Sequence, residues 1–158
     1  YDIDVEVSRF YNVYGPYEPL DEEFGNVIGI WRVKAENGYP LTIVGDGEQR
    51  RDFTHVYDII DGIMGALSSE DQFAIYNLGN SEPVKLDELV HVIGKRLSIE
   101  PKLDHQKLPT GDVQQTFADV SRAKSRLDYM PKISIEDGIY RFVNWYETMM
   151  ESNGKLFS

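Results

Sequence analysis

Two adjacent arginines after a glycine turn form the segment of this sequence best suited to chemistry. The turn is Gly45-Asp46-Gly47, and Arg50 and Arg51 follow it. A glycine turn lets the backbone approach a ligand closely, and a guanidinium group can hold phosphate with two parallel hydrogen bonds. In an extended segment the two side chains point to opposite faces, so one arginine serves a site and the other can pair with Glu48 or Asp52. The segment predicts an anion site, and the alternative is a surface hairpin with solvated charges.

Asn12 is the second candidate, within the run Phe10-Tyr11-Asn12-Val13-Tyr14-Gly15-Pro16. In open α/β sheets, ligands bind beyond the carboxyl ends of strands, where this amide could donate hydrogen bonds. The alternative is an asparagine that satisfies the backbone at a turn.

Asp112, after Gly111, is the third candidate, because its carboxylate could accept a hydrogen bond from a ribose hydroxyl. The simpler reading is an aspartate in a turn. His55 lies inside an expected strand and is expected to be a packed or hydrogen-bonded histidine, not a catalyst. No nucleophile, base and orienting residue can be assembled from this sequence, so we assign no catalytic residue.

Composition excludes several classes of function. Lys and Arg number 16 against 27 Asp and Glu, a formal net charge of −11, which argues against a nucleic-acid or anionic-membrane binder. Without cysteine there is no disulfide or thiolate metal site, and three scattered histidines predict no metal centre. No apolar run is long enough to span a membrane, so we expect a cytoplasmic protein. The chain begins with Tyr1, and we expect a piece of a longer protein.

Elements that alternate between strand and helix must position these side chains, which predicts an α/β fold without internal linkers. The expected strands are 3–14, 41–44, 52–56 and 74–78, with strand and loop over 99–113. The expected helices are 22–37, 58–67 with Asp58 as its cap, 86–97, 121–127 capped by Ser121, and 135–150 capped by Ser134.

Several segments, all in register, resemble the NAD-dependent sugar-nucleotide epimerase/dehydratase family, the extended short-chain dehydrogenases. They are Ser8–Pro16, Pro40–Asp58, Tyr76–Gly79, Gly111–Val113, Ala118–Lys124 with Pro131, and Ile135–Tyr146. The resemblance implies the last strands and helices of an NAD-binding Rossmann fold plus the smaller α/β substrate-binding domain. It also implies that residues 1–158 form a C-terminal region whose segments 3–14 and 52–80 pack on an N-terminal NAD-binding domain.

The resemblance further implies roles for particular positions. Asn12 and Arg51 would hold the diphosphate or sugar of a nucleotide-diphosphate sugar, and Asp112 the nucleoside. The strand residues Leu41, Ile43 and Val44 would pass beside the base. Phe10 and Tyr11 would lie at the nicotinamide end of the NAD cofactor. Many members carry an arginine where this sequence has Leu108-Pro109-Thr110, and an arginine-free stretch favours UDP-glucuronate among the UDP-sugars.

The family's glycine fingerprint and its Tyr-x-x-x-Lys pair are absent from these 158 residues. We therefore expect a chain that binds a nucleotide sugar and is inactive alone, from a parent that is an NAD-dependent UDP-sugar 4-epimerase and a homodimer. The isolated chain is expected to self-associate through exposed apolar surface. The alternatives are a stand-alone nucleotide-sugar binding module and an acidic protein-interaction domain.

Overall fold

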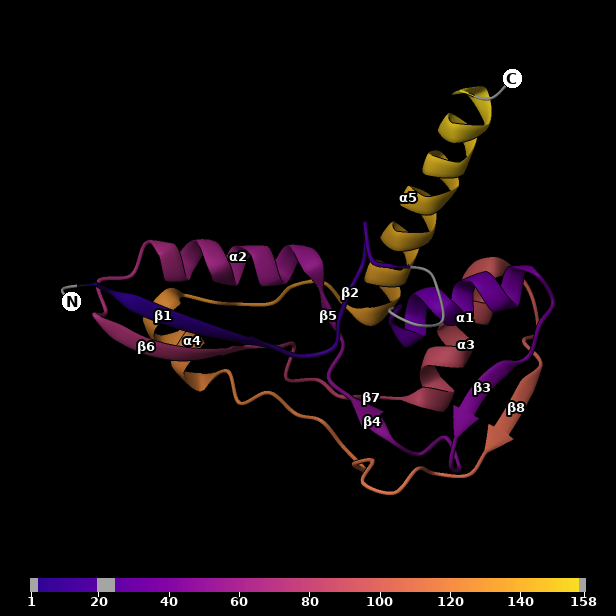
Figure 1. The fold of residues 1–158 in the computed structure, drawn as a ribbon, viewed down its shortest axis with the longest axis horizontal. Helices are drawn as coiled ribbons and strands as arrows, with labels where there is room; N and C mark the ends of the chain where they lie inside the picture. Colours follow the sequence, from indigo (N-terminus) through magenta and orange to yellow (C-terminus); the bar gives the residue numbers. More distant parts are fainter. Residues whose placement is uncertain (1–2, 20–24, 157–158) are drawn as a thin grey trace.

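The computed structural model describes residues 3–19 and 25–156, which form an α/β arrangement of short strand pairs and five helices (Figure 1). The strands are β1 (Val5–Phe10), β2 (Val13–Tyr14), β3 (Leu41–Val44), β4 (Arg50–Arg51), β5 (Thr54–His55), β6 (Phe73–Leu78), β7 (Val84–Lys85) and β8 (Leu103–Gln106). The helices are α1 (Val27–Glu36), α2 (Val56–Leu67), α3 (Leu86–Leu97), α4 (Ser121–Leu127) and α5 (Ile135–Leu156). None of the described helices is long and apolar enough to cross a membrane.

One part of the molecule is built on β1 and β6, which pair in parallel with Val5 opposite Phe73. Ala74, Tyr76 and Leu78 of β6 are fully buried in a core cluster with residues of α2 and α4. Phe73, which alternates with these residues along β6, faces the other way. It stays exposed, as does Val5, its partner on β1. Among residues 3–19 and 25–156, helices cover this sheet on one face only.

The other part packs α1, α3 and the first half of α5 around a second core cluster that includes Leu41 and Ile43 of β3. The strand β3 pairs in parallel with β8. In α5 the buried side chains Ile135, Ile139, Phe142 and Val143 recur at helical spacing. From Glu147 to Glu151 all side chains are exposed, and Figure 1 shows α5 projecting from the rest of the molecule.

Two buried carboxylates join these parts. Asp52 accepts hydrogen bonds from the backbone N–H groups of Asn80, Ser81 and Ala118 at 2.8, 3.1 and 2.8 Å. Asp58 accepts from Lys132 and Ile133 at 3.0 and 3.1 Å. Both side chains are almost fully buried. These carboxylates accept backbone N–H groups in segments that do not pair as regular strands.

The predicted α/β organisation and most of the elements are confirmed, and the deviations have local causes. The first helix begins at Val27, and positions 22–24 of the expected helix lie outside the described residues. Strand structure in 52–56 is limited to Thr54 and His55. The hairpin alternative is wrong, because β3 pairs with β8, and β4 pairs antiparallel with β7.

Two predicted helix caps are wrong, and one is confirmed. His55 caps α2, with its Nδ1 accepting from the Tyr57 N–H at 3.2 Å, while Asp58 lies in the first turn and binds the backbone near Ile133. Ser121 is the first residue of α4, and Asp119 accepts its N–H at 3.0 Å. Ser134 Oγ does accept the N–H of Asp137 at 3.2 Å.

Candidate functional site

The irregular segment 112–118 lies along residues 50–52 and brings distant parts of the sequence together. The Arg50 N–H donates to the Gln114 carbonyl at 3.0 Å, and the Thr116 N–H donates to the Arg50 carbonyl at 3.0 Å. The same pairing forms an isolated parallel bridge between Arg50 and Gln115. It places Asp112 and Thr116 beside the strand that carries Arg51.

Arg51 is held by this segment but keeps free donors. Its Nη1 donates to the carbonyls of Arg50 and Val113 at 3.0 and 2.9 Å, and its Nη2 donates to Asp112 Oδ1 at 2.7 Å. A guanidinium has five N–H groups. The Nε–H and one Nη2–H therefore have no partner among the described residues, and Nε is not buried. A fixed cation with two open donors can bind an anion.

Asp112 is oriented by the same ion pair. Its Oδ1 accepts both from Arg51 and from the Val113 N–H at 2.8 Å, and 30% of its side chain is exposed. Oδ2 accepts no hydrogen bond within residues 3–19 and 25–156, so it is open to a hydroxyl donor.

Asn12 reaches the same place from the end of β1. Its backbone has a φ of 33°, in the left-handed region that asparagine tolerates, and its carbonyl accepts from the Thr54 N–H at 3.2 Å. Its side-chain Oδ1 accepts from Thr116 Oγ1 at 3.0 Å. Asn12 and Arg51 therefore both contact segment 112–118.

A close backbone approach supports this junction. A Cβ added at Gly79 would lie 2.2 Å from the Cβ of Ala118, far inside contact distance. Ala118 is the residue whose N–H binds Asp52. Gly79 therefore lets segment 112–118 run against the end of β6.

The strand β3 presents its side chains in two directions. Leu41 and Ile43 are fully buried in the core, so only their backbone can contact a ligand, whereas Val44 is half-buried on the opposite face. Leu108 lies near the following turn, with its Cδ1 3.7 Å from a Cβ built on Gly45. Val44 and Leu108 thus give the end of β3 an apolar surface.

Phe10 and Tyr11 lie at the carboxyl end of β1. Phe10 is 52% exposed, and Tyr11 is half-buried against the core cluster that contains Tyr76 and Leu78 of β6. The sequence contains no glycine-rich strand-to-helix turn for a dinucleotide pyrophosphate. These two residues could therefore contact one end of an NAD molecule but could not hold the whole cofactor.

The remaining charged candidates are structural. Arg50 donates to the Pro83 carbonyl at 3.2 Å, and Glu48 pairs with Lys85 at 2.5 Å. The predicted pairing of Arg50 with Glu48 or Asp52 is therefore wrong, because among the described residues Asp52 accepts backbone N–H groups instead.

His55 is packed, as predicted. Its ring is fully buried, with its centroid 5.4 Å from that of Tyr14 and 4.9 Å from that of Tyr57. Burial lowers the pKa of His55 to about 4, so the imidazole is neutral near pH 7. Its Nε2 has no hydrogen-bond partner among the described residues. Over the same residues no group of His, Asp and Glu could hold a metal ion.

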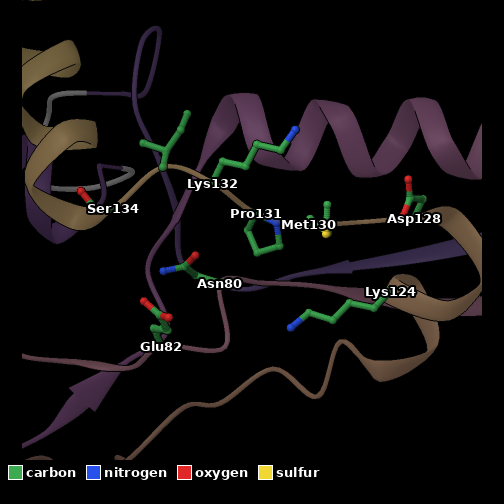
Figure 2. A pocket seen from close by; sticks show the side chains of 9 residues that line it. Asn80, Glu82, Lys124, Asp128, Met130, Pro131, Lys132 and Ser134 are labelled. Atoms are coloured by element: carbon green, nitrogen blue, oxygen red, sulfur yellow. The ribbon is translucent and has the colours of Figure 1, made fainter.

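A hollow of about 470 Å³ lies elsewhere, between the loop after β6, α4 and the extended segment before α5 (Figure 2). Its walls include Asn80, Glu82, Lys124 and Lys132. Figure 2 shows the two lysine side chains extending in opposite directions. None of the predicted site residues lines it, and the lysines do not converge on one point.

Sequence reasoning missed Thr116 and the anchoring role of Asp52. A polar Thr116 four positions after Asp112 in an irregular segment was the only available signal, and it does not identify Asn12 as a partner 104 residues away. The sequence shows that Asp52 is charged, but the three backbone donors that bind it come from segments that only the fold brings together.

Comparison with known proteins places the chain in a family. The model of the NAD dependent epimerase/dehydratase family matches residues 1–79, half of the chain. The chain belongs to this family. It is 34% identical over 152 residues to a UDP-glucuronate 4-epimerase of Thermodesulfobacterium geofontis, an alignment covering 96% of this chain and 46% of that protein. The family resemblance drawn from the sequence is confirmed.

Solved structures of epimerases share the fold. The UDP-glucuronic acid 4-epimerase of Bacillus cereus, solved with UDP-glucuronic acid and NAD, aligns with a TM-score of 0.81 and 28% identity over 90% of this chain and 45% of that one. The UDP-glucose 4-epimerase of Thermotoga maritima, solved with UDP-glucose, gives 0.85 and 26% over 92% and 46%. This chain therefore spans less than half the length of these epimerases. The predicted fold class, part of a Rossmann-type epimerase, is confirmed.

Proposed function

We propose that this chain is the nucleotide-sugar binding part of an NAD-dependent UDP-sugar 4-epimerase, with UDP-glucuronate as the favoured substrate. The observation that carries the proposal is that Asn12 and Arg51 both contact segment 112–118, which carries Asp112. The similarity to UDP-glucuronate 4-epimerases over most of the chain supports it.

Each group has a part of the ligand that suits its chemistry. The open Nε–H and Nη2–H of Arg51 suit the diphosphate, as do the amide donors of Asn12. The free Oδ2 of Asp112 suits a ribose hydroxyl. The half-buried Val44 suits the face of the base, with the backbone of Leu41 and Ile43 beside it.

The redox step of such an enzyme belongs to NAD, which accepts a hydride from the sugar and returns it. The residues of this chain hold and orient the substrate, and Phe10 and Tyr11 would contact the nicotinamide end. The sequence has no Tyr-x-x-x-Lys pair to act as a base, so we expect no turnover by these 158 residues alone. A decarboxylase is the second candidate, because the chain is 30% identical to UDP-glucuronic acid decarboxylase 1 of Arabidopsis thaliana.

We further propose that segments 3–14 and 52–80 pack on an NAD-binding domain of the parent protein. The exposed face of β1 and β6, with Val5, Val7 and Phe73, supports this, as does the outer side of α2, where Met64 and Leu67 are exposed. The parent is proposed to be a cytoplasmic homodimer, and the isolated chain to self-associate through this bare face.

Isothermal titration of the chain with UDP-glucuronate, UDP and UMP tests the proposal. We expect UDP-glucuronate and UDP to bind and UMP to bind more weakly, because UMP lacks the second phosphate. An acidic protein-interaction domain would bind none of them. Binding that persists while a fusion to a family NAD-binding domain folds but shows no sugar interconversion would favour a stand-alone binding module.

A further inference from the structure

We propose that Thr116 is a positioning residue that fixes which side of the Asn12 amide faces the ligand. The inference rests on the proposed nucleotide-sugar site. It assigns a role to a residue outside the set that holds the ligand directly.

The Thr116 hydroxyl makes two hydrogen bonds. Its Oγ1 accepts the backbone N–H of Asp52 at 2.9 Å and donates its proton to Asn12 Oδ1 at 3.0 Å. Its backbone is also held, because its N–H binds the Arg50 carbonyl. Because the Asp52 N–H uses only one of the two lone pairs, the hydroxyl offers Asn12 one proton and one further lone pair, and Thr116 lies beside the strand that carries Arg51.

The hydroxyl favours one of two amide orientations, because its proton has no other acceptor among the described residues if the Asn12 nitrogen faces it. The oxygen and nitrogen of an asparagine side chain occupy nearly the same space, and only hydrogen bonds distinguish them. With Oδ1 bound to Thr116, the Asn12 Nδ2 group has no hydrogen-bond partner among the described residues and is not buried. Its two N–H groups are turned toward solvent, where they can meet an anion.

The opposite orientation would harm an anion site. It would present the Asn12 carbonyl oxygen to the ligand, and that oxygen repels a diphosphate instead of donating to it. The positive charge of Arg51 is already partly balanced, because its guanidinium pairs with Asp112. The orientation set by Thr116 therefore decides whether Asn12 adds to the attraction of Arg51.

Two substitutions separate positioning from packing. Thr116→Val keeps the shape and removes the hydroxyl, and Thr116→Ser keeps the hydroxyl. We expect Thr116→Val to weaken UDP-glucuronate binding about five- to tenfold, the effect of one hydrogen bond, and Thr116→Ser to bind as the unchanged chain does. In an Asn12→Ala background, Thr116→Val should cause no further loss, because Thr116 acts through Asn12.

The side-chain amide signals of Asn12 in nitrogen-15 spectra give a readout that needs no ligand. Thr116→Val should shift them and Thr116→Ser should leave them in place. If no UDP-sugar binds, the proposed function fails while this readout still decides the orientation.

Unchanged Asn12 signals in Thr116→Val, or a loss of affinity that persists in the Asn12→Ala background, would overturn the inference. If Thr116→Val does not fold, the unchanged chain decides. Its Asn12 amide signals must then move when UDP-glucuronate is added, and signals that stay still while the ligand binds contradict the proposal.

Discussion

The guanidinium of Arg51 lies 2.7 Å from the carboxylate of Asp112, although 61 residues separate them in the sequence. In the proposed site one group suits a diphosphate and the other a ribose hydroxyl, so the ion pair would join two parts of one ligand. The pair also leaves donors on Arg51 and an acceptor on Asp112 free. This relationship is the structural basis of the proposed site.

Arg51→Ala should weaken binding of UDP-glucuronate about 10- to 100-fold. The loss of charged hydrogen bonds to phosphate, about 1.5–3 kcal/mol, sets this range. Isothermal titration measures it. Arg126→Ala is the matched control, because Arg126 also pairs with an aspartate, Asp71, but on α4 away from the site. Equal effects of the two substitutions would contradict the assignment of Arg51.

Asp52→Ala should lower the free energy of unfolding by about 3 kcal/mol or more. The substitution leaves three backbone N–H groups without their carboxylate, and each buried group without a partner costs about 1–3 kcal/mol. Urea denaturation measures the change. Asp61→Ala, at an exposed position of α2, should stay within about 0.5 kcal/mol of the unchanged chain. A small effect at Asp52 would show that the junction is held by other contacts.

His55 should make the chain less stable as the pH falls from about 6.5 toward 4. Its pKa is about 4 when folded and 6.5 when unfolded, so the unfolded chain binds more protons in this window and stability rises with pH. This pH-dependent part of the free energy of unfolding is fully present above pH 6.5 and amounts to about 3 kcal/mol.

Glu18 acts in the opposite direction. Burial raises its pKa from 4.5 to about 7, so its contribution is full below pH 4.5 and is lost as the pH rises through 7. The His55 effect is isolated by His55→Asn, which keeps a helix-capping acceptor without the titration. The difference in unfolding free energy between the two proteins should grow from pH 4 to 6.5. A difference that stays constant would contradict the buried neutral imidazole.

Phe73→Ser should reduce self-association of the isolated chain. Phe73 is 65% exposed on the bare face of β1 and β6, next to Val5 in register. Tyr39→Ser is the matched control, because Tyr39 is 64% exposed but lies between α1 and β3. Sedimentation velocity should show a shift toward monomer for Phe73→Ser alone. A monodisperse monomer before any substitution would contradict the proposed docking face.

Elements with a strong internal pattern could be predicted from the sequence. The apolar spacing of α3 gave its bounds, Leu86–Leu97, and Ser134 marked the start of α5. The two-residue strands β4 and β7 could not be predicted, because such short strands exist only through their pairing. The family resemblance, and not periodicity, pointed to Arg51 and Asp112 as parts of one site.

The contacts that complete the site depend on tertiary structure. Thr116 meets Asn12 only because Gly79 and Asp52 hold segment 112–118 in place. Nothing in the sequence indicates that these four residues lie close together. Burial likewise separates Leu41 and Ile43 from Val44, a distinction that the alternation of the strand suggests but that requires the core to be known.

Titration of the nitrogen-15-labelled chain with UDP-glucuronate tests the central claim most directly. We expect saturable changes in the amide signals of Asn12, Arg51, Asp112 and Thr116, with little change at Lys124 and Lys132 of the hollow in Figure 2. The absence of saturable changes, or changes centred on those lysines, would contradict the proposed site.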